Sequence, residues 1–211
     1  MKIAELDYDL RIDELKINIS YAKDIGKSLS SSRREYRKFA DSINIEFVAL
    51  EKSLKSYEYT VLIDAYTLSE QIVKNFYYHL LVANPSNDYV EKFINSKLPK
   101  ERFSPNAKYS EIEKSIKKDL INDFSFLFKN DNDFVKSYNN LISERHLYAH
   151  TGNCTFQFDK IDEAVSMIEY LYKEIENIMT KDHDYGKNFR TEIKNIMDLF
   201  SSTYTILSQY Q

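Results

Sequence analysis

The chain has 211 residues, 43% of them hydrophobic and 29% charged, with a formal net charge of −4. This is the composition of a globular protein, and its acidic balance argues against a protein that coats nucleic acid over its whole surface. Only three glycines and three prolines are present, too few for the turns of an all-β fold. Because Gly26, Gly152 and Gly186 lie far apart, a glycine-rich phosphate-binding loop is excluded.

Nothing in the sequence predicts export or membrane insertion. The apolar runs are shorter than the ~18–20 residues of a membrane span, and the N-terminal segment is too acidic for a signal peptide. The one cysteine, Cys154, permits neither an internal disulfide nor a thiolate metal cluster. We therefore expect a cytoplasmic protein without a membrane segment, folded as a single domain over residues 1–211.

The N-terminal part of the chain predicts three helices. The first covers about residues 6–29 and has an apolar stripe at helical spacing, formed by Ile12, Leu15, Ile19, Ala22 and Ile25. Gly26 and the serines that follow it predict a break or kink. A second helix is expected over residues 33–56. The third, over residues 57–83, is the most apolar stretch, which is typical of a central bundle helix, and it is expected to end before Pro85.

An insertion and two further helices are expected next. Residues 84–108 contain all three prolines and are expected to form an insertion with one short helix near residues 89–95. Helices are then expected over residues 110–128 and 131–150, and Gly152 is expected to cap the latter at its C-terminus.

The cleanest periodicity follows Thr155–Phe158, a segment too short to support a sheet. Apolar residues recur there at alternating spacings of three and four, formed by Phe158, Ile161, Val165, Ile168, Tyr172, Ile175 and Met179. This pattern is typical of a helix in a bundle or coiled coil. A last helix is expected over residues 187–210. Together the segments predict an all-α protein, an antiparallel bundle of about six helices.

The segment that carries chemistry is SERHLYAHTG, residues 143–152. His146 and His150 are four residues apart, so a helix places them on one face, one turn from each other. Arg145 precedes His150 by five residues, which turns it about 140° away at 3.6 residues per turn. One straight helix therefore cannot direct Arg145 and His150 at the same atom. Convergence requires a distorted helix end or a second copy of the motif across a two-fold axis.

These residue types suit the cleavage of RNA without a metal ion. A histidine titrates near neutral pH, so it can take the proton of a 2′-hydroxyl or give one to the leaving 5′-oxygen. An arginine carries a fixed charge and a planar fork that matches phosphate oxygens. DNA lacks the 2′-hydroxyl nucleophile, so RNA is the expected substrate.

The string R-H-L-Y-A-H, from Arg145 to His150, resembles the R-x4-6-H signature of HEPN domains, in which a polar residue commonly follows the arginine. The glycine after the motif and the central apolar helix are also similar to that family. The resemblance covers about residues 57–180, and residues 1–56 and 186–211 would be additional N- and C-terminal helices.

The resemblance implies a homodimer whose two motifs face each other, and a metal-independent endoribonuclease of a toxin–antitoxin or anti-phage system. Arg145 would hold the phosphate, His150 would be the acid and base, and His146 would assist or position, with no cofactor. The implied partners are RNA, a second copy, and an antitoxin or defence protein. In members silenced by a nucleotidyltransferase antitoxin, the modified tyrosine follows the histidine by two residues; this chain has Gly152 there.

Other interpretations of these residues remain open. Cations in the last turn of a helix are favoured by the helix dipole alone. His146, His150 and Cys154 lie at turn spacing and could hold zinc, although Gly152 is expected to break the helix before Cys154. The alternative function is a catalytically inert HEPN-like bundle that serves as a binding or dimerisation module in a defence complex.

Further residues are candidates for supporting roles. Glu70 either orients Arg145 or a histidine, or forms a helix-surface ion pair with Lys74. Tyr148 lies inside the motif and is a second supporting candidate. Two basic clusters either follow an RNA backbone or are solvated faces, the first formed by Arg33, Arg34, Arg37 and Lys38, and the second by Lys97, Lys100, Arg102 and Lys108.

Overall fold

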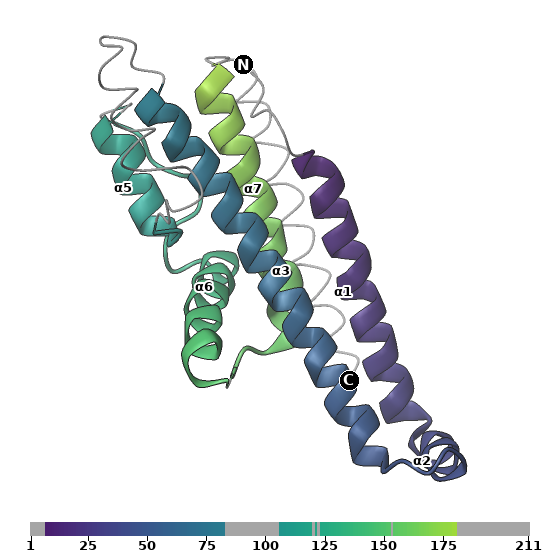
Figure 1. Ribbon diagram of the computed structural model, residues 1–211. Coiled ribbons are helices and arrows are strands. Elements are labelled where there is room, and N and C mark those ends of the chain that lie inside the picture. The colour runs from purple at the N-terminus through teal and green to yellow at the C-terminus, as the bar shows by residue number, and fades with distance from the viewer. Residues whose placement is uncertain (1–6, 83–105, 120, 122, 153, 181–211) are drawn as a thin grey trace. The chain divides into compact units, whose positions relative to one another are not determined.

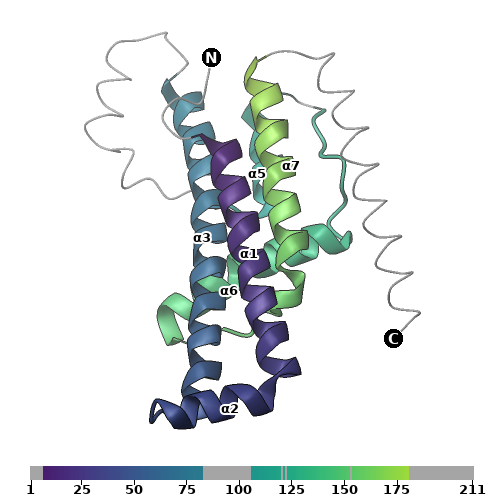
Figure 2. The same ribbon diagram turned by 90° about the vertical axis from the view of Figure 1, so that its right-hand side faces the viewer.

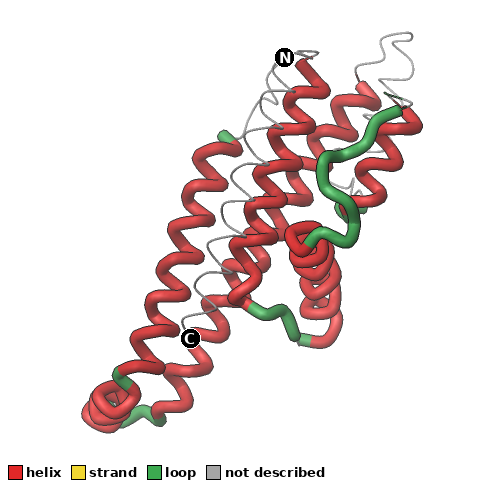
Figure 3. Tube along the Cα trace, turned by 180° about the vertical axis from the view of Figure 1, so that it is seen from behind, coloured by secondary structure: helices red, strands yellow, loops and turns green. Residues whose placement is uncertain are grey.

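The computed structural model describes residues 7–82, 106–119, 121, 123–152 and 154–180. The regular elements in these ranges are all helices joined by loops, without a strand (Figure 3). The prediction of an all-α protein is confirmed. None of the helices described has the length and apolar character that crossing a membrane requires.

The chain divides into two compact units, residues 5–168 in one and residues 1–4 with 169–211 in the other. The boundary falls within helix α7 (Ile161–Thr180). The motif and the elements that position it belong to the unit of residues 5–168.

Helix α1 (Tyr8–Ser31) begins at Asp7, whose side chain accepts a hydrogen bond from the Leu10 amide at 3.1 Å. The predicted stripe is confirmed for its first four members, Ile12, Leu15, Ile19 and Ala22, which are all buried. Ile25 is 45% exposed instead, and Gly26 takes the inward position, where an added methyl group would lie 3.5 Å from Leu54 Cδ2. The predicted break in the segment of Gly26 and the serines after it is confirmed: α1 continues past Gly26, ends at Ser31, and is followed by a new helix from Arg33.

The second predicted boundary, at residues 56–57, is wrong. Helix α2 (Arg33–Ser42) is short, and helix α3 (Phe47–Val82) runs without a break through the expected junction at residues 56–57. The chain turns at Asn44, which adopts a positive φ of 57°, and the Ile45 amide closes the turn on the Ala40 carbonyl at 3.0 Å. Asparagine tolerates this left-handed conformation better than most residues. The turn lets α3 return antiparallel beside α1, with α2 at the connecting end (Figures 1 and 2).

Helix α5 (Tyr109–Asp119) is shorter than the predicted helix over residues 110–128. Phe124 and Phe126 are both buried, and a helix cannot place residues two apart on one face. The chain instead folds back on α5, where the Glu113 carboxylate accepts a hydrogen bond from the Phe126 amide at 2.9 Å. Phe126 also stacks on Tyr109, with ring centroids 4.7 Å apart.

Helix α6 (Asp133–Thr151) packs on α3 and crosses it rather than running alongside it (Figure 2). One buried hydroxyl group fixes this crossing. Tyr138 of α6 donates to the Ala107 carbonyl at 2.5 Å and shares a 2.8 Å hydrogen bond with Ser69 of α3. All three residues are buried, so the network joins α3, α6 and the segment before α5 away from solvent.

The segment after α6 forms no strand at residues 155–158, as predicted, and enters the short 3-10 helix η2 (Phe158–Lys160) and then α7. The predicted seam is confirmed at its inner positions, Ile161, Val165, Ile168, Tyr172 and Ile175, which are buried. The expected helices over residues 89–95 and 187–210, and all but the end of the expected insertion over residues 84–108, lie outside the described residues. The single domain and the homodimer stay predictions.

Candidate functional site

The predicted motif occupies the last two turns of α6. The helix begins at Asn132, whose side chain accepts a hydrogen bond from the Phe134 amide at 2.9 Å. It ends at Gly152, which adopts a φ of +70° and donates its amide hydrogen to the Tyr148 carbonyl at 2.9 Å. The predicted glycine cap is confirmed, and it fixes where the motif helix stops.

His146 and His150 lie together on the solvent side of α6. Their ring centroids are 4.5 Å apart, and the ring planes meet at 66°. Both side chains are exposed, and neither imidazole hydrogen-bonds to another described residue. Leu147, between them in sequence, is 39% exposed. The motif therefore presents two titratable rings and an apolar side chain to the surface.

Arg145 points elsewhere, to the contact between α6 and α3. Its guanidinium carbon lies 4.3 Å from the centre of the Tyr66 ring, and Tyr66 is only 9% exposed. Within the described part of the chain the guanidinium makes no hydrogen bond and no ion pair. No buried side-chain nitrogen or oxygen among those residues lacks a partner, so the N–H groups of Arg145 reach solvent. The stacked guanidinium thus keeps its hydrogen-bond donors available.

The divergence predicted from helical spacing is present in the structure. α6 is one continuous helix through the motif, so Arg145 faces α3 while His150 faces solvent. Within one chain the arginine and the histidine pair are not directed at a common point.

Glu70 belongs to the same neighbourhood as Arg145. Burial raises the pKa of Tyr66, the negative charge of Glu70 raises it further, and the positive charge of Arg145 opposes both. Glu70 and Arg145 are therefore both close enough to act on the Tyr66 hydroxyl. This places the predicted supporting carboxylate beside the Arg145–Tyr66 contact.

Tyr148, the other supporting candidate, packs against Tyr59 of α3. The ring centroids are 5.2 Å apart, and the planes are tilted by 49°. Sequence reasoning did not identify Tyr59 or Tyr66 as partners of the motif. Their spacing of seven residues, which puts them on one face of a helix, was the available signal. That signal could not reveal that α6 covers this face.

The loop after Gly152 is fastened back to the motif helix. Glu144 accepts hydrogen bonds from the Thr155 amide at 2.7 Å and from the Thr155 hydroxyl at 2.8 Å. Cys154 is half-buried, and burial raises the pKa of its thiol, an effect to which the charge of Glu144 adds. Zinc binds the thiolate form, so this environment disfavours Cys154 as a ligand. The described residues contain no group of three or more His, Cys, Asp or Glu side chains arranged to hold a metal ion.

The first basic cluster lies far from the motif. Its four residues are exposed on α2, where Arg33 pairs with Glu51 at 2.9 Å and Arg33 and Arg37 stack on Phe47. Fifteen residues of α3 separate Glu51 from Tyr66, roughly 22 Å at ~1.5 Å per residue. Figure 1 shows α2 at one end of the α1–α3 pair, away from α6. Arg34 and Lys38 are on the same short helix.

The second basic cluster is only partly described. Lys108 is exposed just before α5, whereas Lys97, Lys100 and Arg102 lie outside the described residues.

Comparison of the chain with protein-family models, with curated proteins and with solved structures found no match.

Proposed function

We propose that the protein is a metal-independent endoribonuclease of the HEPN type, in which Arg145, His146 and His150 act on one phosphodiester. The observation that carries the proposal is the exposed pair of histidine rings, 4.5 Å apart at the glycine-capped end of α6. Two adjacent imidazoles give a site both a group that can accept a proton and a group that can donate one.

The reaction follows from these groups. His150 removes the proton of the 2′-hydroxyl, the 2′-oxygen attacks phosphorus, and the bond from phosphorus to the 5′-oxygen breaks. The leaving 5′-oxygen receives a proton from the histidine pair, with His146 assisting. Arg145 binds the phosphate oxygens as negative charge develops on them. The products are a 2′,3′-cyclic phosphate and a 5′-hydroxyl.

The site is composite in this proposal. Arg145 of one protomer meets the histidine pair of a second copy, because the two groups diverge on a single α6. A two-fold interface at the histidine pair would also bury the exposed Leu147 beside it. The free donors of the stacked Arg145 supply the phosphate fork.

The test is cleavage of a labelled RNA oligonucleotide by purified protein in excess EDTA. Wild type and His183→Ala, a histidine substitution outside the motif, are expected to cut, and Arg145→Ala and His150→Ala are expected to lose ~10²-fold or more. An oligonucleotide with a single 2′-deoxy position at the cut site should resist. Uncut RNA in EDTA, with cutting restored by zinc or magnesium, would overturn the mechanism.

One observation favours the alternative, a catalytically inert binding or dimerisation module in a defence complex. Arg145 and Tyr148 both pack on tyrosines of α3, so part of the motif contributes to the helix packing. If cells that express wild type, Arg145→Ala or His150→Ala grow equally and keep the same RNA profile, the inert module is favoured. An antitoxin or defence partner belongs to either function, and the cytoplasm is the expected compartment.

A further inference from the structure

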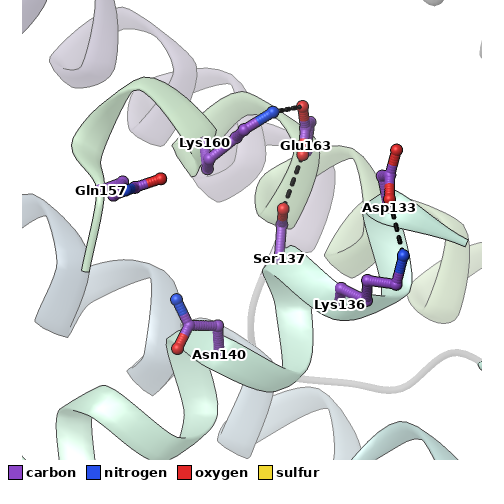
Figure 4. Close-up of a pocket in the computed structure, with 7 residues that line it drawn as sticks. All are labelled: Asp133, Lys136, Ser137, Asn140, Gln157, Lys160 and Glu163. Carbon is purple, nitrogen blue, oxygen red and sulfur yellow. Dashed lines mark hydrogen bonds and ion pairs between the residues drawn. The ribbon is translucent and has the colours of Figure 1, made fainter. Parts of the chain in front are cut away.

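A polar groove of about 310 Å³ lies between the first half of α6 and the segment that leads into α7 (Figure 4). It belongs entirely to the unit of residues 5–168. Its lining residues are all polar or charged, and they are Asp133, Lys136, Ser137, Asn140, Gln157, Lys160 and Glu163. None of them belongs to the proposed catalytic set.

The charges of this groove cancel. Lys136 donates to Asp133 at 2.9 Å, and Lys160 donates to Glu163 at 2.8 Å. Ser137 also donates to Glu163, at 2.6 Å. Two cations and two anions leave the lining formally neutral, which favours neither a phosphate nor a metal ion. A neutral ligand rich in hydrogen-bonding groups fits this lining best.

Two side-chain amides are available to such a ligand. Asn140 of α6 and Gln157 of the loop before η2 are both exposed, and neither side chain hydrogen-bonds to another described residue. In Figure 4 they border the groove from the two segments, apart from the paired charges. Each amide offers donors and an acceptor together. Asparagine and glutamine use this combination to bind the N6 and N7 atoms of adenine.

Asn140 and both histidines are exposed on α6, with His146 turned about 120° from Asn140 around the helix axis at 3.6 residues per turn. Asn140 precedes His150 by ten residues, about 15 Å along the helix and about 80° around its axis. Between Asn140 and His150, the α6 residues Ser143, His146 and Leu147 are also exposed. At ~3.4 Å per stacked nucleotide, this distance corresponds to roughly four nucleotides.

We propose that this groove is a base-binding subsite, which takes an adenine of single-stranded RNA about four nucleotides from the bond that is cut. Asn140 and Gln157 bind the base, and the paired charges around Ser137 form the fixed wall behind it. The subsite rests on the proposed ribonuclease function, because its ligand is the same RNA strand. It gives the enzyme a sequence preference that the Arg/His motif alone does not supply.

The test measures binding apart from cleavage. His150→Ala protein is titrated with fluorescent octauridine strands that carry one adenosine at each position in turn. One position is expected to bind roughly tenfold tighter than octauridine, in line with the discrimination of a good bidentate contact. Adding Asn140→Ala or Gln157→Ala should abolish this preference and keep the affinity for octauridine, whereas Asn18→Ala, an amide substitution on α1, should keep both.

The outcomes separate the two proposals. Equal binding of all strands, or a preference that persists in the Asn140→Ala and Gln157→Ala proteins, overturns the subsite and leaves the ribonuclease in place. If the wild-type protein does not cut RNA in EDTA, the ribonuclease fails, and the subsite falls with it. In the cleaving enzyme, the two groove variants are expected to raise KM for the preferred strand while kcat stays unchanged.

Discussion

Replacing Arg145 with alanine is expected to lower stability as well as activity, because its side chain packs on α3. The guanidinium carbon lies 4.3 Å from the Tyr66 ring centre, well inside the ~6 Å limit of a cation–π contact. Tyr66 is 9% exposed and Arg145 is half-buried, so the contact is partly desolvated and should contribute ~1–2 kcal/mol. For a chain of this size, that corresponds to a Tm change of ~2–8 °C.

A double-mutant cycle measures this contact. Urea unfolding of wild type, Arg145→Ala, Tyr66→Leu and the double variant gives a coupling free energy from which the lost packing of each side chain cancels. The matched control is the cycle of Arg37 and Phe47, in which an exposed guanidinium lies 5.5 Å from the centre of a half-buried ring, and for which ~0.5 kcal/mol or less is expected. A coupling below ~0.3 kcal/mol at Arg145–Tyr66 would refute the anchoring role.

The same variants separate anchoring from phosphate binding. Tyr66→Leu keeps the guanidinium, so at a temperature where each variant is folded it should cleave RNA far better than Arg145→Ala. Equal loss of cleavage in the two variants would mean that Arg145 acts by holding α6 on α3 and not by binding the phosphate.

Three further predictions concern the fold. Tyr138→Phe leaves the buried Ser69 hydroxyl and Ala107 carbonyl without their partner, so urea unfolding should show a free energy of unfolding lowered by ~1–3 kcal/mol. The control, Tyr21→Phe on the exposed side of α1, should lower it by less than ~0.5 kcal/mol. Burial raises the pKa of Tyr138, so as pH rises above ~10 this hydroxyl ionises in the unfolded chain before it does in the folded protein, and the free energy of unfolding should fall. The fall with pH should be less steep in Tyr138→Phe. Equal slopes of unfolding free energy against pH in the two proteins would contradict this. Gly152→Ala should lower stability by ~1–2 kcal/mol through its φ of +70° alone, since an added Cβ meets no atom within 4 Å, and Gly152→Asn should lower it less.

The sequence by itself determined the features that depend on near neighbours in the chain. Helical spacing and the scarcity of glycine and proline are enough to predict an all-α protein. Spacings of four and five residues are enough to pair His146 with His150 and to turn Arg145 away from His150. Gly152 marks the helix end because a left-handed cap favours glycine wherever a helix stops.

Only the tertiary structure decided the features that depend on distant residues. The inward position of Gly26 is set by Leu54 across the α1–α3 contact, and the short α5 is set by aromatic residues that fold back on it. The partners of Arg145 and Tyr148 belong to α3, some eighty residues earlier in the chain, and no local pattern connects the two segments. Helix periodicity specifies which side of a helix is buried, but the packing of one helix on another selects the residues that meet there.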